Sequence, residues 1–350
     1  MRADTLVLFT DQTDRSAVLA ETLDQIAPCR VLSVGDTDAN GACLGLVADV
    51  DLLRPATVRG LRTLLATVRR PGLPFICLTR RMGNRSLAEA RALGAGLSLP
   101  VDTAPETVAE ALLAHLQPPR SIREAKVARG VDRAGTALTR LLDTARAHDT
   151  VDAATVEGGL GPILTAVGAG GLACWLDTVR SYDDGTYQHC LLVAGLAARF
   201  SIDLGFSAAD QQQLVRAALV HDVGKARIPL DILNKPGRLD PDEVAIMRTH
   251  AGLGHEILVA AGGFDAPTLA VVRHHHEMLD GSGYPDGLAG SEIGDIVRLT
   301  TICDIYAALV ERRPYRAPMR SADAMAVLTG MAGKLDAALV RAFARTVAKT

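Results

Sequence analysis

The residues in this sequence that could do chemistry are mostly histidines of its second half. Seven of the nine histidines lie within 88 residues: His189, His221, His250, His255, His274, His275 and His276. A single histidine on an apolar helix face is usually structural, but here several helical segments each carry one. The first of them shares a 3.6-residue stripe with Leu192, Val193, Leu196 and Phe200. This spacing predicts imidazoles that converge on one buried point.

Two acids accompany the histidines. Asp222 follows His221 directly, and Asp304 lies on a stripe with Ile293, Val297 and Ala308. Several imidazoles and two carboxylates buried in an apolar bundle would be very costly without a compensating cation. Nitrogen and oxygen ligands without thiolate suit iron or manganese best, and leave zinc, nickel, cobalt and magnesium open. Because the ligands are too many for one four-coordinate ion, we expect two divalent metal ions bridged by Asp222.

Such a pair of ions predicts a class of reaction. Two metals about 3.5 to 4 Å apart are typical of phosphoester hydrolysis, in which a bridging hydroxide attacks phosphorus in line. The sequence therefore indicates a metal-dependent phosphohydrolase.

The ligands require a helical scaffold, and the second half of the chain supplies one. Strand signals almost vanish after about Asp152, and an Asp240-x-x-Glu243 capping box with Pro241 begins the helix expected to carry His250. Residues Gly158 to Leu176 carry no charge, but six glycines and Pro162 favour a buried helical pair over a membrane span. Before them, Ser121 to Ala147 reads as a long connecting helix.

The first half alternates strands with helices. Strand-sized apolar runs occur at Thr5 to Phe9, Val31 to Val34, Leu44 to Val50 and Pro74 to Thr79. Helical spacing occurs at Ser16 to Ile26, Val58 to Arg69, Ser86 to Leu93 and Pro105 to Leu116. This alternation predicts a doubly wound α/β domain, so the chain is expected to be multidomain, α/β followed by all-α.

Composition narrows the function classes. The 37 Lys and Arg against 40 Asp and Glu give a net charge of −3, which does not favour DNA binding. Six scattered cysteines without a CxxC pair, and no signal-peptide core, fit a cytoplasmic protein with neither zinc ribbon nor disulfide scaffold.

The helical half resembles a known family. The segment His221-Asp222-Val223-Gly224-Lys225 is similar to the HD-x-GK signature of HD-domain phosphohydrolases. His275-His276-Glu277, followed by Asp280 to Pro285, resembles the HHE…DGxGYP signature of the HD-GYP subfamily. Three further motifs stand in the family's order: Ile228-Pro229, Lys235-Pro236-Gly237 and Arg313-Pro314-Tyr315-Arg316. The resemblance covers roughly Asp152 to the C-terminus.

This resemblance implies a phosphodiesterase that opens cyclic di-GMP to pGpG, with GMP left open as a later product. The family's metal ligands fall on His189, His221, Asp222, His250, His275, His276 and Asp304. A glutamate that adds a third metal in some members is replaced by Gly185, which favours two metals. The family's usual second aspartate three residues after Asp304 is Ala307, which predicts a lost hydrogen bond and a lower rate.

The resemblance also assigns residues around the metals. Lys225 is expected to stabilise the scissile phosphate, while Arg313 and Arg316 hold phosphate by bidentate hydrogen bonds. Glu277 is expected to orient a ligand histidine. The loop Gly283-Tyr284-Pro285 borders the substrate mouth or, alternatively, contacts GGDEF-type cyclases.

The α/β half resembles a response-regulator receiver of two-component signalling, with flavodoxin-like topology. Asp51 matches the phospho-acceptor, Asp11 one member of the magnesium pair, and Thr79 the switch hydroxyl. The lysine expected before Pro100 is Leu99, and Thr10 replaces the second acid. We therefore expect a degenerate receiver used for docking or dimerisation, with an intact phosphorylation switch as the alternative.

These interpretations divide the chain into a receiver-like domain (1–118), a linker helix (119–150) and an HD-GYP domain (151–350). A homodimer is expected, with the linker helix coupling the parts. Two rival functions stay open. One is an idle scaffold that senses cyclic di-GMP or binds a cyclase, and the other is hydrolysis of another cyclic dinucleotide such as cyclic GMP-AMP.

Overall fold

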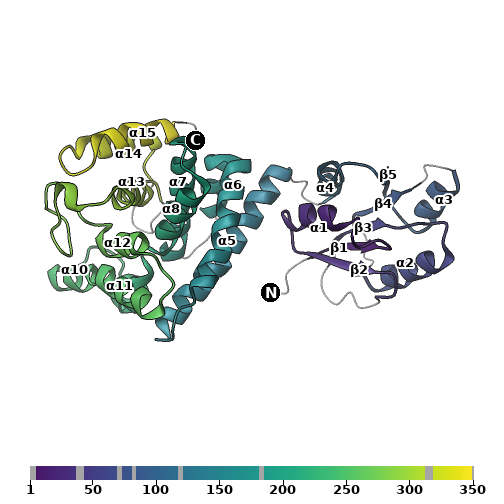
Figure 1. Cartoon of the computed structure of the whole chain (residues 1–350), viewed down its shortest axis with the longest axis horizontal. Helices are drawn as coiled ribbons and strands as arrows, with labels where there is room; N and C mark the ends of the chain where they lie inside the picture. The colour runs from purple at the N-terminus through teal and green to yellow at the C-terminus, as the bar shows by residue number, and fades with distance from the viewer. Residues whose placement is uncertain are drawn as a thin grey trace. The chain divides into compact units, whose positions relative to one another are not determined.

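The structure is a computed structural model that describes residues 5–36, 43–68, 73–80, 84–116, 121–180, 185–311 and 318–348. The chain forms two compact units, Met1–Arg129 and Gly130–Thr350 (Figure 1).

The first unit is built on a five-stranded sheet in which all pairings are parallel. Its strands are β1 (Thr5–Thr10), β2 (Cys29–Ser33), β3 (Cys43–Asp49), β4 (Phe75–Thr79) and β5 (Leu97–Pro100). Their order is β2-β1-β3-β4-β5, so the chain reverses direction across the sheet between β1 and β3. Four strands were predicted. β5 was missed because its four residues, three half-buried and one exposed, lack an apolar run.

Helices cover both faces of this sheet (Figure 1). Helices α1 (Ala17–Asp24) and α4 (Pro105–Ala114) bury one set of strand residues, which includes Leu6, Leu8, Val47 and Ile76. Helices α2 (Pro55–Val68) and α3 (Asn84–Ala92) bury the alternate set, which includes Val7, Phe9, Leu46 and Ala48. Successive strand residues point to opposite faces, so two apolar layers form. The α/β prediction is confirmed.

The predicted connecting helix is α5 (Ile122–Arg146), and the division between the two units falls inside it. Ala125 packs into the core of the sheet unit. From Gly130 onward the helix belongs to the helical unit, where it packs on α6 (Ala153–Val179). A Cβ at Gly130 would lie 2.5 Å from the Cβ of Ala166, so the two helices approach closely only because this residue is glycine.

Helix α6 is the one described helix that is long and apolar enough to cross a bilayer, and half of its most apolar window is buried inside the structure. Its backbone leaves helical geometry at Gly171 (φ 74°, ψ 162°), which divides it into two pieces, as the sequence predicted. In the second piece, the indole of Trp175 is fully buried and donates to the carbonyl of Leu191 at 2.9 Å. These are the features of a core helix.

The rest of the helical unit surrounds α7 (Gly185–Asp203), whose residues from Gln188 to Ala198 are all buried. It packs on α6, α8 (Ala208–Val220) and α13 (Asp295–Val310). The remaining elements are the short helices η1 (Val223–Arg227), α9 (Leu230–Leu233) and η2 (Gly290–Glu292), and α10 (Pro241–Arg248), α11 (His250–Ala261), α12 (Ala266–His274), α14 (Ser321–Gly330) and α15 (Ala337–Val347). The all-α prediction holds for the described residues.

The capping box of Asp240 and Glu243 is present with Pro241 in the first turn, but the helix it begins does not reach His250 as predicted. Helix α10 ends at Arg248, and α11 begins at His250. At the junction, the Thr249 hydroxyl donates to the carbonyl of Ile246, and the His250 ring bonds to the carbonyl of Met247. These side chains use carbonyls that a continuous helix would pair with its own backbone.

Candidate metal centre

The seven predicted ligands lie together, and most come from the ends of helices. His221 caps α8, Asp222 directly precedes η1, and His250 opens α11. His275 and His276 follow the last residue of α12. The other two, His189 and Asp304, project from the interiors of α7 and α13.

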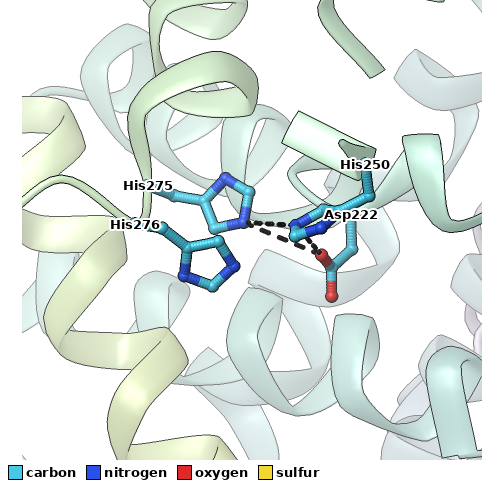
Figure 2. Close-up of side chains that lie close together, drawn as sticks. All are labelled: Asp222, His250, His275 and His276. Carbon is cyan, nitrogen blue, oxygen red and sulfur yellow. Dashed lines mark hydrogen bonds and ion pairs between the residues drawn. The ribbon is translucent and has the colours of Figure 1, made fainter. Parts of the chain in front are cut away.

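The Asp222 carboxylate lies between two groups of imidazole nitrogens. Its Oδ1 is 3.3 Å from His250 Nε2 and 3.7 Å from His275 Nε2, as Figure 2 shows. Its Oδ2 is 3.3 Å from His221 Nε2 and 3.7 Å from His189 Nε2. Each oxygen therefore faces a different pair of histidines, which is the arrangement a bridging carboxylate requires.

Asp304 faces the same centre from α13. Its Oδ1 is 2.9 Å from His189 Nε2 and 3.9 Å from His221 Nε2, while its Oδ2 is 3.7 Å from His276 Nδ1. The donor atoms form two sets, each with all its members within 4.8 Å of one another. One set is Asp222, His250, His275 and His276, and the other is His189, His221 and Asp304.

Three of the imidazoles are aimed by carbonyls of the helix that precedes each of them. The Nδ1 atoms of His221, His250 and His275 bond to backbone carbonyls three residues earlier, at 2.8, 2.7 and 3.1 Å. A carbonyl only accepts, so each Nδ1 carries the proton and each Nε2 presents a lone pair to the centre. Metal-ligating histidines are held in this way in proteins.

The fourth imidazole is oriented by a residue that the sequence reasoning missed. Glu311, buried at the end of α13, places its Oε2 2.8 Å from His189 Nδ1. It lies seven residues after Asp304, which is two helical turns, so both acids project from one face of the helix. This seven-residue spacing from Asp304 was the sequence signal that could have identified Glu311. Ala307, where the family has an aspartate, lies between them along the chain and is fully buried.

Two buried polar atoms at the centre have no hydrogen-bond partner among the described residues: His221 Nε2 and Asp222 Oδ1. A buried polar atom left unpaired costs about 1–3 kcal/mol, so native structures rarely tolerate two side by side. Both atoms are good ligands for a divalent cation, and one belongs to each set of donors. The residues present therefore fit a pair of metal ions.

Electrostatics keep the donors in their ligating forms. Burial lowers the pKa of His275 well below its ordinary value and that of His276 to about 4, so both rings are neutral at pH 7. Burial raises the pKa of Asp222, but Lys225 and His221 outweigh it and hold this pKa well below the usual range. Burial also lowers the pKa of His189, yet hydrogen bonds to Asp304 and Glu311 raise it to about 9. This last ring must lose a proton to bind a metal.

Lys225 lies against the centre, with its Nζ 2.5 Å from Asp222 Oδ2. The tight turn of η1 brings it there, and Gly224 makes this turn possible. A Cβ at Gly224 would lie 1.9 Å from the carbonyl oxygen of His250, so no other residue fits between η1 and α11. The side chains of Lys225 and His276 are 22% and 24% exposed, whereas the other ligands are at most 8% exposed. These two mark the open side of the centre.

The predicted loop Gly283-Tyr284-Pro285 lies at this open side. Gly283 packs on the chain that carries the ligands, because a Cβ there would lie 2.4 Å from Glu277 Cα. The ring of Tyr284 stacks on His276 at 4.7 Å between centroids. Tyr284 is half-buried and borders the centre.

The role predicted for Glu277 is wrong. Its carboxylate accepts the backbone N–H groups of Asp286, Gly287 and Leu288 at 2.7 to 3.1 Å, so it fixes the loop rather than a histidine. Glu277 follows His275 and His276 in sequence, but α12 has already ended at His274. The side chain of Glu277 is therefore directed at the loop and not at the histidines. Orientation of a histidine by a glutamate belongs instead to Glu311.

Two other groups complete the account. Arg313 and Arg316 lie outside the described residues. Cys190, which follows His189 in the chain, has its sulfur within 4.8 Å of donor atoms of His221 and Asp222. Burial raises the pKa of this thiol well above its ordinary value, which keeps it protonated and a poor ligand.

The sheet unit has an acidic cluster of its own, at the carboxyl ends of β1 and β3. Arg80 forms an ion pair with Asp11, whose other oxygen accepts the backbone N–H of Asp51 at 3.1 Å. Asp49, which was not predicted, is buried and receives Arg15 at 2.7 Å and the Ser16 hydroxyl at 2.8 Å. A pocket of about 240 Å³ lies beside the cluster and is lined in part by Asp51, Thr79, Arg80 and Ser86.

Comparison with known proteins assigns the helical unit. Residues 175–339, which include all seven predicted ligands, match the family model described as HD domain. Over this segment the helical unit is similar to HD domains. Cyclic di-GMP phosphodiesterase PA4108 of Pseudomonas aeruginosa is 33% identical over 208 residues, 59% of this chain and 48% of the relative. The 3′3′-cGAMP-specific phosphodiesterase 3 of Vibrio cholerae is 39% identical over 188 residues, 53% of this chain and 38% of the relative.

The chain thus spans about half or less of the length of these curated relatives. Among solved structures, the HDG"Y"P protein Bd1817 of Bdellovibrio bacteriovorus superimposes with a TM-score of 0.53 at 17% identity. The superposition covers 65% of this chain and 73% of that one. At this identity, the superposition shows a shared fold alone.

Proposed function

We propose that this protein is a phosphodiesterase whose HD domain hydrolyses cyclic di-GMP to pGpG at a two-metal centre. The observation that carries the proposal is the placement of the Asp222 oxygens, each of which faces a different set of buried donors. Similarity to named cyclic-dinucleotide phosphodiesterases supports the choice of substrate class. The distances from the two Asp222 oxygens support Asp222 as the bridge between the ions.

The residues divide the work as follows. Two divalent ions held by the seven ligands would supply Lewis acidity and an activated water. Asp222 and Asp304 hold negative charge against the ions, and Glu311 and the backbone carbonyls keep the imidazoles aimed at them. Lys225, next to Asp222 on the open side, is placed to bind an oxygen of the scissile phosphate as a point charge. Arg313 and Arg316 would add bidentate phosphate contacts.

The choice between cyclic dinucleotides is a finer proposal. We take cyclic di-GMP as the substrate and 3′3′-cGAMP as the alternative. Both are considered because the relative named for cyclic di-GMP is 33% identical to this chain and the relative named for 3′3′-cGAMP is 39% identical. The test is the kcat/KM for each dinucleotide on the metal-loaded protein, together with metal content and identification of the product. About two ions per chain and release of pGpG support the proposal. Two ions with nucleotide binding but no turnover would instead indicate a sensor.

For the sheet unit we propose a degenerate receiver-like domain that docks a partner, with a second copy of this chain as the expected one. The supporting observation is that Arg80 and Arg15 already neutralise Asp11 and Asp49, where a receiver would need carboxylates free for magnesium. Incubation with acetyl phosphate and Mg²⁺ should leave Asp51 unmodified by mass spectrometry. Light scattering on the full chain tests the homodimer, and a pull-down with a GGDEF cyclase tests the alternative partner of the GYP loop.

A further inference from the structure

Arg248 lies close to the candidate metal centre and has no counter-ion among the residues that the structure describes. It is the last residue of α10, two residues before the ligand His250, and its side chain is exposed. Among the residues that the structure describes, it forms no ion pair, whereas neighbouring cations such as Lys235 and Arg273 each pair with an acid. A full positive charge left uncommitted beside an active site is available to an anionic ligand.

A stack of rings ties this charge to the centre. The guanidinium carbon of Arg248 lies 4.9 Å from the centroid of the Tyr284 ring. The same ring stacks on the ligand His276 at 4.7 Å with an interplanar angle of 30°. Exposure increases outward along the series, from the buried His275 through His276 and Tyr284 to Arg248. The guanidinium is therefore held by a cation–π contact one ring beyond a ligand, on the open side.

Its place in the stack of rings separates its role from that of Lys225. In the proposed function the scissile phosphate lies at the ions, where Lys225 contacts the Asp222 carboxylate. Arg248 instead lies on the far side of the Tyr284 ring from His276, so we assign it to a different phosphate. A cyclic dinucleotide carries a second phosphodiester across its ring, and this group also needs a cation. Guanidinium binds phosphate in a bidentate fashion and keeps its charge at any working pH.

We propose that Arg248, supported by the Tyr284 ring, binds the non-scissile phosphate of the cyclic dinucleotide and so selects substrates with two phosphodiesters. This inference rests on the proposed function, because it assumes that the scissile phosphate occupies the metal centre. Arg248 is a substrate-binding residue in this proposal, and the chemistry stays with the metal ligands and Lys225.

The test compares Arg248→Gln with wild type on two substrates. Cyclic di-GMP has two phosphodiesters, and bis(4-nitrophenyl) phosphate has one. For Arg248→Gln we expect KM for cyclic di-GMP to rise by roughly 10-fold or more, as befits loss of a charge-assisted bidentate contact, with kcat and metal content unchanged. Hydrolysis of bis(4-nitrophenyl) phosphate should stay at the wild-type rate. Arg248→Lys keeps the positive charge but loses the bidentate guanidinium. Its KM for cyclic di-GMP should therefore lie between those of wild type and Arg248→Gln.

Arg341→Gln is the matched control, because Arg341 is an exposed arginine of α15. It should leave both substrates unaffected. An unchanged KM for cyclic di-GMP in Arg248→Gln would overturn the inference, while the proposed function would stand if the wild type is active. A KM increase that differs between cyclic di-GMP and 3′3′-cGAMP would also overturn it, because the residue would then contact a base. A wild type that hydrolyses neither substrate would contradict the proposed function itself.

Discussion

The two units each gather carboxylates at one point, but they neutralise them differently. In the helical unit, Asp222 and Asp304 face imidazole nitrogens, Asp222 also pairs with Lys225, and two buried donor atoms have no partner among the described residues. In the sheet unit, Asp11 and Asp49 are paired with arginines. The first cluster holds more nitrogen and oxygen donors than its own cations satisfy, so its residues fit external metal ions. In the second cluster, each of these two acids already has a guanidinium partner.

The largest expected effect comes from removing the bridge. Asp222→Ala removes both the oxygen that faces His250 and His275 and the oxygen that faces His221 and His189, so the protein should lose both bound ions and at least roughly 1,000-fold in kcat/KM. Metal analysis and hydrolysis of cyclic di-GMP measure the two losses. Asp265→Ala, which changes an acid at the start of α12, is the control and should keep its metal. If Asp222→Ala kept its full metal content, the proposed contrast between a metal-binding cluster in the helical unit and arginine-paired acids in the sheet unit would be wrong.

Lys225→Ala should separate binding of metal from turnover. The seven ligands remain, so metal content should match wild type, while kcat should fall by about 100-fold because the scissile phosphate loses a charged contact. Lys235→Ala removes an ammonium that pairs with Glu243 instead and should leave kcat near wild type. An unchanged rate in Lys225→Ala would show that its role is limited to neutralising Asp222.

Glu311→Gln tests the acid that orients His189. An amide in place of the carboxylate can still reach Nδ1 but no longer raises the basicity of the ring, so metal affinity should fall by about 10-fold. Competition with a chelator measures the affinity. The sign of the pH effect follows from the raised pKa of His189, about 9 in the metal-free protein. Metal must displace that proton, so affinity should rise with pH up to about 9, and less steeply in Glu311→Gln.

The smallest expected effect is in the sheet unit. Arg80→Ala leaves Asp11, whose side chain is 7% exposed, without its cation. The cost should be about 2 kcal/mol, seen as a fall of about 7 °C in the midpoint of thermal unfolding of the sheet unit. Mg²⁺ should restore part of that stability in the variant and have no effect on wild type. Arg54, 65% exposed, is the control, and Arg54→Ala should change the midpoint little.

The sequence was informative where period and residue type agree. The α/β and all-α halves followed from strand and helix periods, and the seven proposed ligands were found from inward stripes and from the resemblance to HD-GYP proteins. The structure brings all seven together, and their role as ligands stays a proposal. Glu311 was missed because no motif marks it and only its place two turns after Asp304 relates it to the centre. Arg80 was missed because its partner, Asp11, lies 69 residues away.

Local breaks were also hard to predict. The interruption at Thr249 depends on side chains that compete for carbonyls of α10, and the direction of Glu277 depends on the chain turning after α12. Neither feature follows a helical or strand periodicity, so the spacing of apolar residues does not predict it. Strand β5 was not predicted because its place in the sheet depends on pairing with β4 rather than on its own composition.

Helix α5 has a practical consequence for anyone who excises one half of the protein. A fragment that starts at residue 151 would discard Val131, Leu138 and Leu141, which are buried, and would uncover the face of α6 on which this helix packs. A fragment that stops at residue 118 would lack Ala125, which packs into the core of the sheet unit. Fragments of the two halves should therefore both include this helix, because each half buries residues of it.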